Sequence, residues 1–85
     1  MKNKKLKLLI VDDEPDILEI MSEEFNCRGH NVTVAINGNN AVEILKNVTF
    51  DAVVSDFKMP NGNGMVVLSF VSSLSSPPIF FFVSG

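Results

Sequence analysis

The chain has 85 residues, of which 46% are hydrophobic and 20% charged, and its formal net charge is -3. This composition excludes a disordered chain and allows one domain with a small core. The acidic balance argues against nucleic-acid binding. No apolar stretch approaches the roughly 18 residues of a membrane span, and the single cysteine, Cys27, excludes an intrachain disulfide. We therefore expect one cytoplasmic domain, 1–85, that binds neither nucleic acid nor membrane.

The N-terminal half of the chain alternates strand-like and helix-like patterns. Residues 6–11 form a near-continuous apolar run, which is typical of a strand covered on both faces of a parallel sheet. Pro15 fits the first turn of a following helix, whose apolar residues recur at helical spacing as far as a stop at Gly29. Residues 32–36 alternate in polarity and predict a short second strand.

The C-terminal half continues this alternation. Asn37-Gly38 predicts a turn before a second helix, and residues 50–55 predict a third strand. A third helix over residues 65–74 and a wholly apolar fourth strand over residues 79–83 follow. The expected inward-facing residues of the two helices are Ala41, Leu45 and Val48, and Leu68, Val71 and Leu74.

Strands that alternate with helices at this spacing predict βαβ units, hence an α/β fold with a parallel sheet and helices on both faces. In such sheets, sites form beyond the carboxyl ends of the strands. Asp12, Asp13, Asp56 and Ser84 all fall at such ends. We therefore expect these four side chains to cluster in space.

Three carboxylates a few ångströms apart repel one another, so the cluster favours a hard divalent cation, and Mg²⁺ prefers oxygen ligands. A metal beside an exposed carboxylate suits phosphoryl transfer, with Asp56 as the nucleophile. An isolated Asp12-Asp13 pair would more simply be a helix cap with a solvated neighbour. The third acid, Asp56, favours the site.

Four motifs stand in order along the chain: Val11-Asp12-Asp13-Glu14, Asp56-Phe57-Lys58-Met59-Pro60, Asn63-Gly64, and Pro78-Ile79 leading to Ser84-Gly85. Together they resemble the motifs of response-regulator receiver domains, the CheY-like modules of two-component signalling. The resemblance implies a flavodoxin-like fold with strand order 2-1-3-4-5. Because the chain stops after four strands, the resemblance also implies a receiver fold that is truncated at its C-terminal end.

The resemblance assigns a role to each matched residue. It implies that Asp13 and Asp56 ligate Mg²⁺ or Mn²⁺ directly, that Asp12 does so through water, and that the Lys58 backbone carbonyl completes the protein ligands. The domain would then be a phosphoacceptor and not an enzyme, apart from slow autodephosphorylation. Its phosphodonor would be a sensor histidine kinase or a phosphotransfer protein.

Two further residues gain a role from the resemblance. It implies that the hydroxyl of Ser84 reaches toward the phosphoryl group as the switch residue, and that the Gly85 amide lies close by. A lysine that the family places in the pocket has no equivalent in this chain. Loss of one such donor typically slows the chemical step by a factor of about 100 to 1000, so the chemistry would be weakened.

The apolar fourth strand supports a second hypothesis. In a sheet that ends with residues 79–83, this strand lies at an edge and invites association. We therefore expect a homodimer built on it, and the chain could instead be a protein-interaction module, impaired in phosphorylation, that keeps the acidic pocket. A fragment that simply aggregates is the alternative. An aspartate-nucleophile phosphatase would need an acid at position 58, where the chain has lysine.

Overall fold

A computed structural model describes residues 5–56 and 64–83 of the chain. Strands and helices alternate strictly along them: β1 (Lys7–Val11), α1 (Pro15–Cys27), β2 (Asn31–Ala35), α2 (Gly38–Asn47), β3 (Ala52–Asp56), α3 (Gly64–Ser72) and β4 (Ile79–Val83). The four strands pair in parallel in the order β2-β1-β3-β4. The predicted α/β class and parallel sheet are confirmed. Within the described ranges, no helix is long and apolar enough to cross a membrane.

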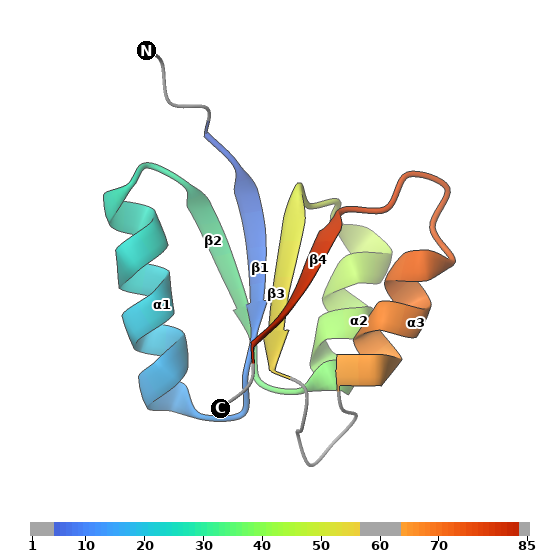
Figure 1. The fold of residues 1–85 in the computed structure, drawn as a ribbon, viewed down its shortest axis with the longest axis horizontal. Coiled ribbons are helices and arrows are strands. Elements are labelled where there is room, and N and C mark those ends of the chain that lie inside the picture. Colours follow the sequence, from blue (N-terminus) through green and yellow to red (C-terminus); the bar gives the residue numbers. More distant parts are fainter. Residues whose placement is uncertain (1–4, 57–63, 84–85) are drawn as a thin grey trace.

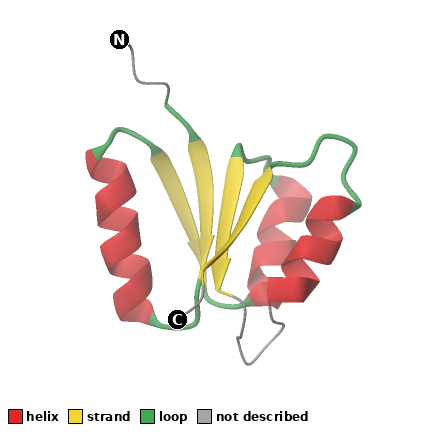
Figure 2. Cartoon of the chain, in the orientation of Figure 1, coloured by secondary structure: helices red, strands yellow, loops and turns green. Residues whose placement is uncertain are grey.

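The sheet lies between two layers of helices. Helix α1 covers one face beside β1 and β2, whereas α2 and α3 pack side by side on the other face (Figures 1 and 2). The main core lies between the sheet and the α2–α3 layer. Its buried members are Leu9, Val11, Ala35, Ala41, Leu45, Phe50, Val53, Val67 and Val71.

The ends of the first two helices follow from local chemistry. Pro15 opens α1, where its missing N–H costs no hydrogen bond, and the chain leaves the helix through Gly29 at φ 90°. Asn37 caps α2, because its side-chain Oδ1 accepts a hydrogen bond from the Asn40 backbone N–H at 2.7 Å. The expected turn at Asn37-Gly38 was therefore wrong in detail, since Gly38 is already the first helical residue.

The predicted inward face of α3 was also partly wrong. Val67 is fully buried and Val71 is 2% exposed, so these two residues, one turn apart, face the core. Leu68 is only half-buried, and Leu74 lies beyond the end of the helix. A run of adjacent apolar residues does not by itself fix which side of a helix faces inward, and packing against α2 decides it here.

Strand β4 lies at one edge of the described sheet, as its sequence position predicted. Phe80 packs against the core on the side of α2 and α3. Alternate residues point to the opposite face, where Ile79 is 63% and Phe81 54% exposed. Phe80 and Phe82 meet edge to face with ring centroids 5.0 Å apart. The edge strand therefore leaves large apolar side chains in contact with solvent.

Candidate metal centre

Two neighbouring strands deliver acidic side chains to the same edge of the sheet. Strands β1 and β3 pair in parallel with Val11 opposite Ser55, so the next residues, Asp12 and Asp56, lie side by side. The backbone N–H of Asp12 donates to the Ala35 carbonyl at the end of β2, at 3.1 Å. The backbone of Asp12 is therefore held to the end of the neighbouring strand β2.

Asp12, Asp13 and Asp56 form a compact cluster of carboxylates. One oxygen from each residue can be chosen so that all three lie within 4.8 Å of one another. Asp12 is only 7% exposed, Asp56 is half-buried and Asp13 is exposed. The cluster thus has a buried floor and an open side through which a solute can approach.

The electrostatics of the cluster are unfavourable for three charged acids. Burial raises the pKa of the Asp12 carboxyl above its ordinary value, and the negative charges of Asp56 and Asp13 raise it further. A hydrogen bond from the Glu14 backbone N–H to Asp12 Oδ1, at 2.9 Å, offsets part of this effect. The ionised cluster therefore has a standing preference for an added positive charge.

The cluster fits a hard divalent cation. All three groups offer oxygen atoms, which Mg²⁺ prefers as ligands. Asp12 is already buried in the folded chain, so binding a metal removes little further water from it. Among the described residues, the two ion pairs found join Arg28 to Glu24 and Lys46 to Glu43. Neither pair involves the cluster, so its negative charge is not neutralised by them.

Two hydrogen bonds between side chain and backbone near the cluster were not predicted from the sequence. The Glu14 N–H holds one oxygen of Asp12, in the pattern of a short acid that accepts from the backbone two residues later. The fully buried Ser55 donates its hydroxyl hydrogen bond to the Asp56 carbonyl at 2.9 Å. A lone serine in an apolar strand, directly before the acid, was the available signal.

Three expected site residues, Lys58, Ser84 and Gly85, lie outside the described residues. The described part of β4 ends at Val83, which pairs with Asp56 in the sheet register. The carboxyl end of β4 therefore reaches the same edge as the acidic cluster.

Comparison with known proteins agrees with this arrangement. The sequence profile of the response regulator receiver domain matches residues 8–85. The chain belongs to the response-regulator receiver family. This receiver domain is 44% identical over 57 residues to the response regulator SaeR of Staphylococcus aureus, an alignment that covers 67% of this chain and 25% of SaeR. It thus matches about a quarter of that curated relative.

Solved receiver structures have the same fold. The response regulator TrrA of Thermotoga maritima, solved in complex with Mg(2+)-BeF, has a TM-score of 0.86 and 28% identity, over 95% of this chain and 70% of that one. A CheY-like receiver domain protein of Methanospirillum hungatei has a TM-score of 0.90 over 96% of this chain and 66% of that one. At 24% identity, the second comparison supports the fold alone.

Proposed function

We propose that this receiver domain accepts a phosphoryl group on Asp56 from a sensor histidine kinase or a phosphotransfer protein. The observation that carries the proposal is the carboxylate cluster at the carboxyl ends of β1 and β3. Within it, Asp56 is half-buried, so one carboxylate oxygen can remain accessible to a donor while Asp12 and Asp13 supply the surrounding charge. Membership of the receiver family supports this reading.

We further propose that Asp12, Asp13 and Asp56, with the Lys58 backbone carbonyl, hold Mg²⁺, for which Mn²⁺ could substitute. When bound, the ion would neutralise charge on the oxygens of the phosphoryl group. The raised pKa of Asp12, caused by burial and by its acidic neighbours, supports such a need for positive charge. TrrA, the relative solved with Mg(2+)-BeF, has the same fold.

In the proposed step, a carboxylate oxygen of Asp56 attacks the phosphorus of a phosphohistidine. An oxygen–phosphorus bond forms, the phosphorus–nitrogen bond breaks, and its electron pair stays on the imidazole nitrogen of the donor. The Ser55 hydrogen bond to the Asp56 carbonyl would keep the attacking residue in place. Ser84 and Gly85 would contact the phosphoryl oxygens, and slow hydrolysis of the acyl phosphate would restore the carboxylate.

Intact mass spectrometry tests the proposal directly. The 85-residue chain incubated with Mg²⁺ and acetyl phosphate should gain the mass of one phosphoryl group, and hydroxylamine should remove it. Asp56→Asn should gain nothing, whereas Asp16→Asn, an exposed acid in the first turn of α1, should behave like the parent. An unmodified parent, or equal modification of the Asp56 variant, would rule out this function.

We also propose that residues 1–85 act as one domain in the cytoplasm. In the described part of the chain, one cluster of buried apolar residues draws members from both the sheet and the helices, which supports one folding unit. The cytoplasmic assignment rests on the proposed partner, because a sensor kinase presents its phosphohistidine on that side of the membrane.

A second candidate function, self-association, is favoured by the exposed edge of β4. Within the described sheet β4 pairs with β3 and lies at the edge, and edge strands are favoured places for association with another chain. Ile79 and Phe81 are each more than half exposed on the same face. We propose that a second copy of the chain covers this edge, because an uncharged apolar strand is complementary to itself across a two-fold axis.

Sedimentation at micromolar concentration tests the dimer. The 85-residue chain should sediment as a dimer, and Phe81→Lys should make it monomeric by placing a charge in the contact. Ile20→Lys, a matched change of an apolar residue that is 63% exposed on α1, should leave the dimer intact. A parent that remains monomeric, or equal effects of the two variants, would refute the β4 interface.

A further inference from the structure

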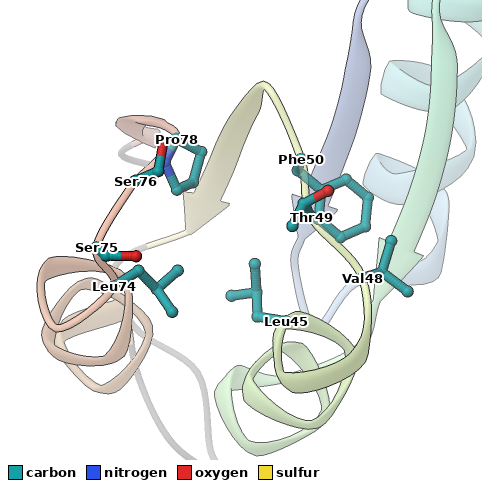
Figure 3. Close-up of a pocket in the computed structure, with 8 residues that line it drawn as sticks. All are labelled: Leu45, Val48, Thr49, Phe50, Leu74, Ser75, Ser76 and Pro78. Carbon is teal, nitrogen blue, oxygen red and sulfur yellow. The ribbon is translucent and has the colours of Figure 1, made fainter.

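A cavity lies away from the acidic cluster, on the side of the sheet covered by α2 and α3. It has a volume of about 150 Å³ and lies where the C-terminal end of α2 and the connection from α2 to β3 face the connection from α3 to β4 (Figure 3). Strand β3 begins at this end and carries Asp56 at its other end, so the cavity and the carboxylates are separated by the length of a strand. Its lining residues are Leu45, Val48, Thr49, Phe50, Leu74, Ser75, Ser76 and Pro78.

The cavity has an apolar floor that is part of the protein core. Leu45 and Phe50 are 6% and 8% exposed and belong to the buried cluster, and Val48 packs against it. Leu74 faces Leu45 across the opening (Figure 3). Because core packing sets the floor, the floor of the cavity is formed before any ligand binds.

Hydroxyl groups stand at the rim of this apolar hollow. Thr49, Ser75 and Ser76 are exposed, and Figure 3 shows the Ser75 side chain directed toward the space between Leu74 and Leu45. None of the eight lining residues that the structure describes is charged. A ligand with a net charge would lose hydration here without gaining an opposite charge, so the lining selects a neutral molecule.

The size of the cavity limits the ligand further. An apolar cavity of about 150 Å³ accommodates one molecule of benzene, so a single six-membered ring fills the available space. A ring that carries one hydroxyl group could also exchange a hydrogen bond with a serine at the rim. We propose that this cavity is a binding site for a small neutral aromatic molecule with one hydroxyl group, of the phenol class.

The proposed site joins segments that are distant in the sequence. A ring held between Leu45 and Leu74 would tie α2 to the connection that leads into β4. A ligand that binds the folded chain and not the unfolded chain stabilises the folded state. Phenol should therefore raise the unfolding temperature of the protein.

Two-dimensional NMR of the isotope-labelled 85-residue chain, titrated with phenol, tests the proposal. Phenol should cause saturable shifts of the backbone amides of residues 45–50 and 74–76. Benzoate, which adds a charge to a ring of similar size, should not cause saturable shifts of these amides. Toluene, which lacks the hydroxyl group, should bind about two- to tenfold more weakly than phenol, the range expected for the loss of one hydrogen bond.

A matched pair of variants locates the binding site. Ser75→Leu should block the mouth and weaken phenol binding at least about tenfold. Ser72→Leu, the same change at an exposed residue of α3 outside the lining, should bind phenol like the parent. Both residues are exposed, and unchanged backbone amide positions away from the substituted residue in the spectrum of each variant would show that the fold is intact.

Three results would overturn the proposal. The first is an absence of saturable shifts at these amides with phenol. The second is equal binding of benzoate and phenol, which would remove the argument from charge. The third is unchanged phenol affinity in a folded Ser75→Leu variant, which would place binding elsewhere.

Discussion

Neutralising Asp12 should stabilise the metal-free protein and weaken its response to Mg²⁺. The variant Asp12→Asn keeps an oxygen that can accept the hydrogen bond of the Glu14 N–H, so it removes the charge and little else. Because Asp12 and Asp13 are adjacent in the chain, their repulsion persists in the unfolded state. The repulsion that folding creates is the one between Asp12 and Asp56.

The size of this effect follows from the geometry. At 4.8 Å, the limit within which the carboxylate oxygens lie, two unit charges repel by about 0.9 kcal/mol at the dielectric constant of water and by about 3.5 kcal/mol at an effective value of about 20. Since the cluster is open on one side, the lower figure is the closer one. Asp12→Asn should therefore raise the free energy of unfolding by about 1 kcal/mol, which raises the melting temperature of a domain of this size by about 4–8 °C.

The gain should depend on pH in a definite direction. Burial and the neighbouring acids raise the pKa of Asp12 in the folded state above its ordinary value of 3.8. The folded chain therefore holds the proton of the Asp12 carboxyl more tightly than the unfolded chain. As pH rises from the ordinary pKa of Asp12 through its raised pKa in the folded state, the contribution of Asp12 to stability falls. In the presence of EDTA, the advantage of Asp12→Asn over the parent should grow as pH rises above about 3.8.

Thermal unfolding with and without Mg²⁺ provides the measurement. At a Mg²⁺ concentration ten times its Kd, the parent should gain about 1.4 kcal/mol, and Asp12→Asn should gain much less. Glu19→Gln removes the same charge from an exposed position on α1 and should keep the parent response. A variant less stable than the parent without metal, or one with an undiminished Mg²⁺ response, would refute the reasoning.

Three further predictions test the fold by urea unfolding. Asn37→Ala removes the cap of α2 and should cost about 1 kcal/mol, whereas Asn37→Asp should cost little; equal losses would argue against the cap. His30 Nδ1 accepts the Leu6 backbone N–H at 3.1 Å, so His30→Ala should cost about 1 kcal/mol, and an unchanged midpoint would show that this bond contributes nothing. Val67→Ala should cost more than Leu68→Ala although it deletes fewer atoms, because Val67 is fully buried; the reverse order would contradict the observed face of α3.

The order and type of all seven elements were predictable from the sequence. Hydrophobic periodicity and the residues that begin and end helices are local signals, so Pro15 and Gly29 bracket α1 in the structure as they do in the pattern. The same local signals placed Asp12 and Asp56 at the carboxyl ends of strands. The residue pattern predicted a parallel sheet, and the resemblance to receiver domains supplied its strand order.

Only the tertiary structure decided how the elements meet. It set β1 against β3 in the register that brings Asp12 beside Asp56, and it chose Val67 over Leu68 as the buried residue of α3. It also formed the cavity between Leu45 and Leu74, which are far apart in the sequence. These features depend on contacts between distant segments, whose energies arise only when the packed layers exclude water, and no local pattern encodes them.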